Sequence, residues 1–264
     1  MAENRIEKHL KELQERKEKA FITYITAGLP NMAATAAIIK AQEATDIIEL
    51  GIPFSDPTAD GPVIQQASYE AICAGASLKK TFELMKSLRE EGIEKPIIFM
   101  LYYNTIVNCG LEDFVRQCKE AGVDGLIVPD LPIEEQEPLR KALETEPSVI
   151  LIQLVSPVSG ERIPEILKGA RGFVYCVSSM GVTGQAADFH REVLNYLKSV
   201  REVSEVPVMM GFGIREANDV RPMKDIIDGA IVGTAFITLM REAGFDPQAA
   251  REYTERFKRE LSEL

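Results

Sequence analysis

The stretch Glu49-Leu-Gly-Ile-Pro-Phe-Ser-Asp-Pro-Thr-Ala-Asp60-Gly-Pro62 places two carboxylates at the two ends of a loop that follows an apolar segment. Residues 46–50 read as a short strand, and the three prolines that come next rule out regular strand pairing beyond it. Glu49 therefore ends a rigid element, whereas Asp60 is carried by the loop. Barrel enzymes present their catalytic groups in this way, and two neighbouring acids indicate proton-transfer chemistry.

Outward from this stretch, short apolar segments alternate with segments of helical spacing. We expect strands at residues 21–25, 46–50, 96–101, 125–128, 149–152, 172–177, 207–210 and 229–232. Between them apolar residues recur every three or four positions, as at Leu111, Phe114 and Cys118, which is the spacing of an amphipathic helix. Apolar strands that alternate with helices call for a parallel sheet covered by helices. Eight such units without a break predict a closed (β/α)8 barrel rather than an open sheet.

Two helices are expected in addition to the eight units. Ile6, Leu10 and Leu13 form a thin apolar stripe on a highly charged opening helix, which we interpret as a solvated cap in preference to a plug for the bottom of the barrel. Near the other end, Asp246-Pro247 is a typical helix start, and the helix after it carries an apolar stripe that we expect to face the core. The predicted fold class is α/β, with one TIM barrel domain over residues 1–264.

Composition agrees with this fold and excludes several classes of function. The chain has 264 residues and 45% hydrophobic content, which is enough for one large core. The net charge of −11, without a clustered basic patch, argues against a nucleic-acid partner or an anionic membrane surface. No apolar run approaches the ~20 residues of a membrane span and no signal core opens the chain, so we expect a cytoplasmic protein. The four cysteines lack metal-ligand spacing, and we expect free thiols and no metal.

Glycines supply a second chemical signal, at the ends of the last two predicted strands. Gly211-Phe212-Gly213 follows the seventh strand, and Gly233-Thr234-Ala opens a helix after the eighth. In barrels the loops after strands seven and eight commonly bind phosphate, with help from a helix N-terminus. Tight turns alone would also use glycine, but glycines at both expected positions favour phosphate binding. A third loop, residues 178–187, is small and polar, and we interpret it as a lid in preference to a passive connection.

These motifs, in this order and over essentially the whole chain, resemble the alpha subunits of tryptophan synthase. The resemblance is carried by residues 49–65, Gly181-Val-Thr183-Gly184, Gly211-Phe-Gly213 and Gly233-Thr-Ala. It implies retro-aldol cleavage of indole-3-glycerol phosphate to indole and glyceraldehyde 3-phosphate in tryptophan biosynthesis, with no metal or organic cofactor in this chain. It also implies a partner, the beta subunit, which would hold pyridoxal phosphate and receive indole within an alpha2beta2 heterotetramer.

The resemblance implies a role for each matching residue. Glu49 would be the general acid and base, and Asp60 would accept the indole N–H hydrogen bond and offset its developing charge. Either acid alone could be structural, but their occurrence in one motif favours catalysis. The implied substrate and phosphate site comprises Tyr175, Thr183, Gly184, Phe212, Gly213, Gly233 and Thr234. The implied indole pocket comprises Tyr24, Met100 and Ile127, positions that would also pass as ordinary core, and the partner contact comprises Pro53, Asp56 and Pro57.

Four positions depart from the family pattern. Ser179-Met180 lacks an arginine that some members carry in the lid, and Thr234 replaces a more common serine. Gln153 puts an amide where an apolar residue is expected near the indole, which would change the polarity of the pocket.

Three other interpretations stay open. A free-standing indole-3-glycerol-phosphate lyase would share the site, although the chain has no transit-like leader. An allosteric binding subunit with decayed catalysis would not need both acids, and another phosphate-handling barrel isomerase would lack the stretch from Glu49 to Asp60.

Overall fold

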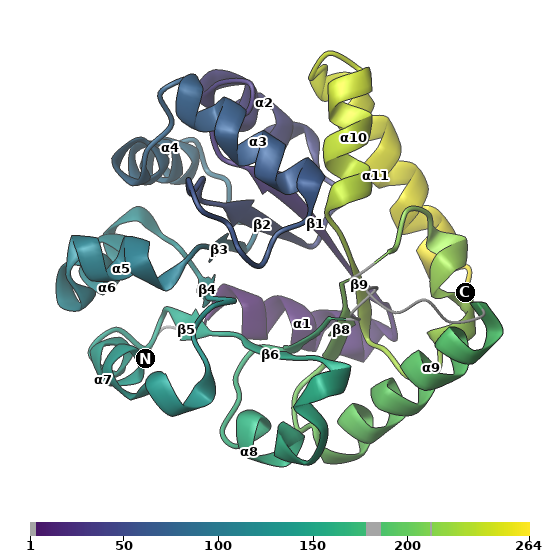
Figure 1. Cartoon of the computed structure of the whole chain (residues 1–264). Coiled ribbons are helices and arrows are strands. Elements are labelled where there is room, and N and C mark those ends of the chain that lie inside the picture. Colours follow the sequence, from purple (N-terminus) through teal and green to yellow (C-terminus); the bar gives the residue numbers. More distant parts are fainter. Residues whose placement is uncertain (1–3, 178–185, 212) are drawn as a thin grey trace.

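The strands of the computed structural model form one parallel sheet in the order β5-β4-β3-β2-β1-β9-β8-β7-β6 (Figure 1). The structure describes residues 4–177, 186–211 and 213–264. The strands are β1 (Ala20–Thr26), β2 (Ile47–Gly51), β3 (Ile97–Met100), β4 (Gly125–Ile127), β5 (Ile150–Leu151), β6 (Gln153–Val155), β7 (Val174–Cys176), β8 (Val208–Met210) and β9 (Gly229–Val232). Each of the eight predicted strand segments contains a strand. The fifth segment, residues 149–152, contains β5, and β6 begins directly after it, beyond the predicted bounds.

The fifth predicted strand shows how the barrel closes. β5 lies within that segment and β6 follows it, and the two are separated in the chain by Ile152 alone. β5 pairs with β4, whereas β6 pairs with β7, so the two ends of the sheet lie on adjoining residues. The predicted (β/α)8 barrel is therefore confirmed.

Helices from α2 (Met32–Ala41) onward surround this barrel as a ring, whereas α1 (Arg5–Arg16) lies across its centre in the view of Figure 1. The helices after α2 are α3 (Pro62–Cys73), α4 (Leu78–Glu90), α5 (Tyr103–Cys109), α6 (Leu111–Ala121), α7 (Glu137–Glu144), α8 (Ile163–Leu167), α9 (Ala186–Val203), α10 (Thr234–Glu242) and α11 (Pro247–Ser262), with short 3-10 segments η1 (Ile133–Glu135), η2 (Pro157–Arg162) and η3 (Ala217–Met223). Among the described helices, none is both long and apolar enough to cross a lipid bilayer.

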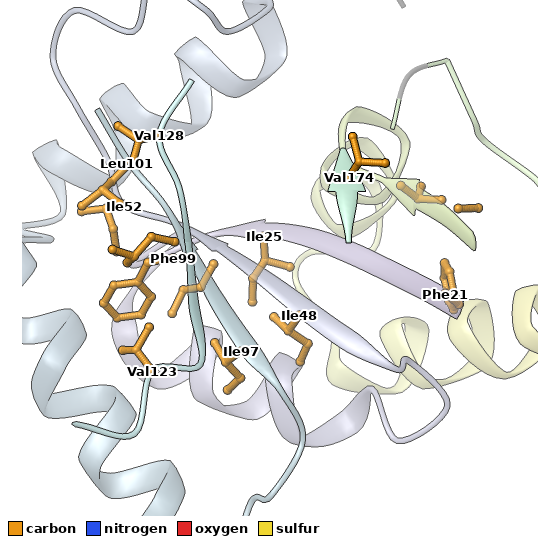
Figure 2. Close-up of a cluster of buried hydrophobic side chains, with 14 of the residues drawn as sticks. Phe21, Ile25, Ile48, Ile52, Ile97, Phe99, Leu101, Val123, Val128 and Val174 are labelled. Carbon is orange, nitrogen blue, oxygen red and sulfur yellow. The ribbon is translucent and has the colours of Figure 1, made fainter. Parts of the chain in front are cut away.

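The strands bury both of their faces. Outward-facing side chains form a large core with the helices, and Figure 2 shows members of it such as Ile48, Ile97 and Phe99. Inward-facing side chains form a second cluster inside the barrel, which includes Ile47 and Ile98. Neighbouring positions on β2 and β3 thus point to opposite faces, as the period of two in a strand requires. Burial on both faces accounts for strands that are apolar throughout.

The interpretation of the opening helix as a solvated cap is wrong. Ile6, Leu10 and Leu13 are at most 4% exposed and belong to the cluster inside the barrel. In Figure 1, α1 lies across the centre of the ring of strands. The amino end of the barrel needs apolar cover, and the stripe of α1 supplies it. Asn4 caps this helix and donates its Nδ2 hydrogens to the carbonyl oxygens of Asp124 and Ser148, at 2.8 and 2.7 Å.

The predicted C-terminal helix is confirmed as α11. Its N-cap Asp246 accepts a hydrogen bond from the Gln248 N–H at 3.0 Å, and Pro247 occupies the first turn. The ring of Phe257 stacks on that of Phe21 with 4.2 Å between centroids. This contact joins the last helix to the first strand from outside the barrel.

Candidate active site

Glu49 lies near the carboxyl end of β2 and faces the barrel interior, because its neighbours Ile48 and Leu50 belong to the outer core. It is 1% exposed, and within the described residues neither of its carboxylate oxygens has a hydrogen-bond partner. Burial raises the pKa of Glu49 to about 8, and the negative charge of Asp60 contributes to the rise. The Glu49 carboxyl is thus mainly protonated at neutral pH and can donate a proton to a ligand inside the barrel.

Asp60 approaches from the loop between β2 and α3. Its Oδ2 accepts a hydrogen bond from the Tyr102 hydroxyl at 3.0 Å. Burial raises the pKa of Asp60 above its ordinary value, while the Tyr102 hydrogen bond acts in the opposite direction. The charge of Asp60 acts on Glu49, so the two acids interact electrostatically. Their surroundings differ, which suits them to different protonation states.

Two tyrosines from opposite parts of the sheet complete the polar lining. Tyr24 on β1 and Tyr175 on β7 are both buried, and burial raises the pKa of each hydroxyl. The charges of Asp60 and Glu49 reinforce that rise, which shows that all four groups occupy one region. Both tyrosines therefore stay protonated at any physiological pH.

Glycines at strand ends make room for these tyrosine rings. A Cβ atom on Gly51 would lie 2.1 Å from the Tyr24 Oη, and one on Gly211 would lie 2.5 Å from the Tyr175 ring. Real contacts of a Cβ are essentially never so short, so any side chain at either position would displace a tyrosine. Neither Gly51 nor Gly211 was predicted to have this role from the sequence, although each directly follows a predicted strand segment, and that position was the available signal.

Apolar residues of the expected indole pocket lie at the same end of the barrel. Ile127 is buried in the interior cluster, and Met100 packs against that cluster and against the group that contains Tyr24. The pocket residues named from the sequence are thus brought together by β1, β3 and β4.

Gln153 does not face the pocket. In the register of β6 it pairs with Val174, whose side chain lies in the outer core, whereas the next residue, Leu154, packs against the interior cluster. The expected change in pocket polarity is therefore wrong, because strand alternation turns this amide toward the helices. Its Oε1 atom is buried without a hydrogen-bond partner in the described part of the chain.

The expected phosphate residues lie after the last two strands. Gly213 follows β8 with a φ of +71°, and Gly233 caps α10, whose first residue is Thr234. The N–H groups of a first helical turn lack partners within the helix, and the helix dipole favours an anion there. Thr183, Gly184 and Phe212, together with Ser179 and Met180 of the expected lid, lie outside the described residues.

The expected partner contact is a surface at the carboxyl end of the barrel. Asp56 is exposed and accepts a 2.5 Å hydrogen bond from the Ser55 hydroxyl, whereas Pro53 and Pro57 are half-buried. Two valines in helices that follow strands β3 and β6 are also exposed: Val107 in α5 by 50% and Val158 in η2 by 86%.

Two surface cavities lie at the opposite end of the molecule. One of about 250 Å³ is lined by residues that include Leu13, Lys19 and Asp228, and one of about 420 Å³ by residues that include His9 and Lys95. Both adjoin α1, far from the cluster of acids and tyrosines. We locate the site by that cluster, because catalytic groups in barrels gather at the carboxyl ends of strands. Within the described residues, no group of three or more His, Cys, Asp or Glu side chains could hold a metal ion.

Comparisons with known proteins agree on one family. The family model described as tryptophan synthase alpha chain matches residues 10–264. A tryptophan synthase alpha chain from Lachnospira eligens is 56% identical over 262 residues, which cover 98% of this chain and 99% of the relative. The solved structure of tryptophan synthase subunit alpha from Legionella pneumophila has a TM-score of 0.89 at 32% identity, with 100% of both chains covered. A ligand-free variant of tryptophan synthase from M. tuberculosis gives 0.86 at 30% identity, with 98% of this chain and 100% of that chain covered.

Proposed function

The chain belongs to the tryptophan synthase alpha chain family, and from this premise we propose that it cleaves indole-3-glycerol phosphate to indole and glyceraldehyde 3-phosphate. The observation that carries the proposal is the buried Glu49 carboxyl, which has no hydrogen-bond partner among the described residues and lies within electrostatic reach of Asp60. A buried acid without a partner is costly to the fold, and such costs concentrate at functional sites.

The reaction needs one proton to enter and one to leave. The protonated Glu49 carboxyl donates its proton to indole C3, which leaves positive charge on the ring nitrogen. Asp60 accepts the indole N–H hydrogen bond and stabilises that charge. The Glu49 carboxylate then takes the proton of the C3′ hydroxyl, the C3–C3′ bond breaks, and its electron pair returns to the indole ring. Glyceraldehyde 3-phosphate leaves as the aldehyde, and Glu49 is protonated again.

Binding groups fall at the two ends of this substrate. The rings and apolar side chains of Tyr24, Met100 and Ile127 form walls that suit a flat indole. The phosphate is held by backbone N–H groups at Gly213 and at the N-terminus of α10, which begins at Thr234. Tyr175, Thr183, Gly184, Phe212 and Gly233 complete the proposed substrate site.

A second protein completes the pathway in this proposal. The loop from Pro53 to Asp60 contacts a tryptophan synthase beta subunit in an alpha2beta2 assembly, which holds pyridoxal phosphate and uses the indole. The exposed Asp56 forms an ion pair with that partner, and the exposed apolar side chains of Val107 and Val158 extend the same surface. The assembly works in the cytoplasm.

The test is indole release from indole-3-glycerol phosphate by the purified chain, with and without a tryptophan synthase beta subunit. Slow release that rises sharply with the partner is expected. Fast release that ignores the partner would instead identify a free-standing lyase, and no release in either condition would identify a binding subunit. A Glu49→Gln variant should lose turnover while it still binds the substrate, and cleavage at the wild-type rate would refute the acid–base role of Glu49.

A further inference from the structure

Tyr102 follows β3 and contacts the loop that carries Asp60, although nothing in the sequence motifs singles it out. Its hydroxyl accepts a hydrogen bond from the Ala59 N–H at 2.9 Å and donates one to the Asp60 Oδ2 at 3.0 Å. Tyr102 itself is only 5% exposed. A single buried hydroxyl, two residues beyond the end of β3, thus holds both the backbone and the acid of a loop that is mostly exposed.

The ring of Tyr102 is fixed by the beginning of the same loop. Phe54 stacks on it with 5.1 Å between ring centroids and 25° between ring planes. Other described hydrogen bonds of this loop are local, such as those from Thr58 N–H to the Asp56 carbonyl and from Asp60 N–H to the Pro57 carbonyl. Tyr102 therefore fixes the position of the loop relative to the barrel.

The direction of the hydrogen bond follows from the charges. Burial raises the pKa of the Tyr102 hydroxyl, and the nearby Asp60 charge raises it further, so the hydroxyl stays protonated and remains a donor. The bond in turn lowers the pKa of Asp60 and so opposes the effect of burial. Within the described residues no donor reaches the other oxygen, Oδ1 of Asp60, which leaves that atom available to accept a hydrogen bond from a ligand.

We propose that Tyr102 is a positioning residue, which occupies Oδ2 of Asp60 so that Oδ1 is aimed at the indole N–H before the substrate binds. This inference deepens the proposed function and rests on it for the identity of the ligand group. Because the same ring stacks on Phe54, movement of the partner-contact loop is transmitted through Tyr102 to the acid. Tyr102 acts through Asp60 and makes no contact with the reacting atoms in this scheme.

The test uses a Tyr102→Phe variant, which keeps the ring and removes both hydrogen bonds. A hydrogen bond to a charged group is worth enough to predict a fall in kcat of about tenfold, with KM changed much less. The acid limb of the pH–rate profile should move to higher pH, because Asp60 loses a donor to its ionised form. Tyr69→Phe is the matched control, since Tyr69 is 64% exposed on α3 and should leave kcat and the profile unchanged.

Two further measurements separate positioning from a merely structural role. In an Asp60→Asn background the Tyr102→Phe change should lower kcat little further, because both substitutions act through the same hydrogen-bonded pair. The pKa of Asp60, followed by carboxyl carbon NMR, should rise in Tyr102→Phe even if the wild-type chain cleaves nothing. An unmoved Asp60 pKa, or additive losses in the double variant, overturns the inference. Lack of cleavage by the wild type, together with a shifted Asp60 pKa, overturns the proposed function alone.

Discussion

Glu49 is the residue at which the proposed chemistry and the stability of the fold conflict most directly. Its folded pKa of about 8 exceeds the ordinary value of 4.5, so the folded chain binds a proton that the unfolded chain releases between these values. The loss of folding stability caused by the buried Glu49 is absent below pH 4.5, grows as pH rises, and is complete above pH 8. The site thus retains a group that weakens the fold at the pH where it works.

A Glu49→Gln variant should show this cost in its stability. Its free energy of unfolding relative to wild type should increase from pH 5 to pH 8 by on the order of 3 kcal/mol, since one pKa unit is worth roughly 1.4 kcal/mol. Chemical denaturation at both pH values measures the difference. The control is Glu135→Gln at an exposed position, for which the difference between the two pH values should stay near zero. A pH-independent Glu49→Gln effect would contradict the raised pKa.

The same shift predicts how cleavage depends on pH. If protonated Glu49 donates the first proton, kcat/KM should fall above a pKa near 8. The acid side should fall as Asp60 is protonated, at a pH above its ordinary value of 3.8, because burial raises that pKa. Steady-state rates between pH 4 and pH 10 measure both limbs. A rate that keeps rising through pH 8 would show that Glu49 acts first as a base.

The two acids could be identified from the sequence, but their positions relative to each other could not. Glu49 and Asp60 are visible because a loop with three prolines frames them. Tyr102 was missed because its role depends on a contact between two loops that are 42 residues apart in the chain. Gln153 was misplaced because its orientation follows from the register of a three-residue strand, and a shift of one residue reverses the face.

Among the elements, helix α1 is the one whose place in the fold differs from the prediction. A solvated cap and a buried plug have the same apolar stripe, and the sequence does not show which end of the barrel is open. The structure decides for the plug, since the stripe of α1 fills the amino end of the barrel.

A Leu13→Ala variant tests that plug. Leu13 is 2% exposed, so its truncation should lower the free energy of unfolding by about 2–5 kcal/mol, as for other large-to-small changes in cores. Lys11→Ala on the exposed face of the same helix should change it by less than about 0.5 kcal/mol. Equilibrium denaturation of the two variants gives the comparison. Equal small losses would return α1 to the role of a solvated cap.

The loop between β2 and α3 is the element that joins chemistry to partnership. An Asp56→Ala variant should weaken activation by the beta subunit more than it weakens cleavage by the chain alone, because Asp56 is exposed and is not part of the acid pair. Kinetic titration with the beta subunit measures both quantities. Asp113→Ala, an exposed change on α6, serves as the control. Equal loss of activation and of intrinsic cleavage would contradict a partner-specific role.

Across the whole molecule, Asp46 ties together segments from both ends of the chain. Its carboxylate accepts hydrogen bonds from His9 Nε2 on α1 at 2.9 Å, from Lys258 Nζ on α11 at 2.7 Å, and from the Phe21 N–H at 2.7 Å. Burial alone would raise the pKa of Asp46, but the bonds from His9 and Lys258 outweigh burial and hold it below its ordinary value. This cluster closes the amino end of the barrel around α1.

An Asp46→Asn variant should therefore lose stability at neutral pH, by about 3 kcal/mol, as when one partner of a buried ion pair is removed. Asp46 has a lowered folded pKa, so its contribution is present above pH 3.8 and is lost as pH falls through that lower value. The gap between variant and wild type should consequently close in acid. Denaturation at pH 7 and pH 3 checks this, with the surface change Asp113→Asn as a control near zero at both. A gap of the same size at both pH values would show that packing, and not charge, explains the loss.

The overall architecture could be predicted because eight apolar segments alternate with amphipathic ones. Closure could be inferred only from the number of units, since no residue pattern states which strands meet. The fifth strand shows the limit, because β5 and β6 divide their pairing between β4 and β7 within six residues. Residues 178–185 of the predicted lid and part of the phosphate site lie outside the described residues, and their predicted roles stay predictions; the last two residues of the predicted lid begin α9.

The closure between β5 and β6 also affects how molecules of this chain meet one another. An open sheet exposes a row of backbone donors and acceptors at each edge, on which another molecule can add a strand and begin an aggregate. Here the described strands pair around the ring, and the two ends of the sheet adjoin at Ile152. If the pairing of β5 with β4, or of β6 with β7, were lost, the exposed edges would be strands of only two or three residues. So short a template resists aggregation even when the barrel opens, and it leaves the loops as the surfaces through which this molecule recognises others.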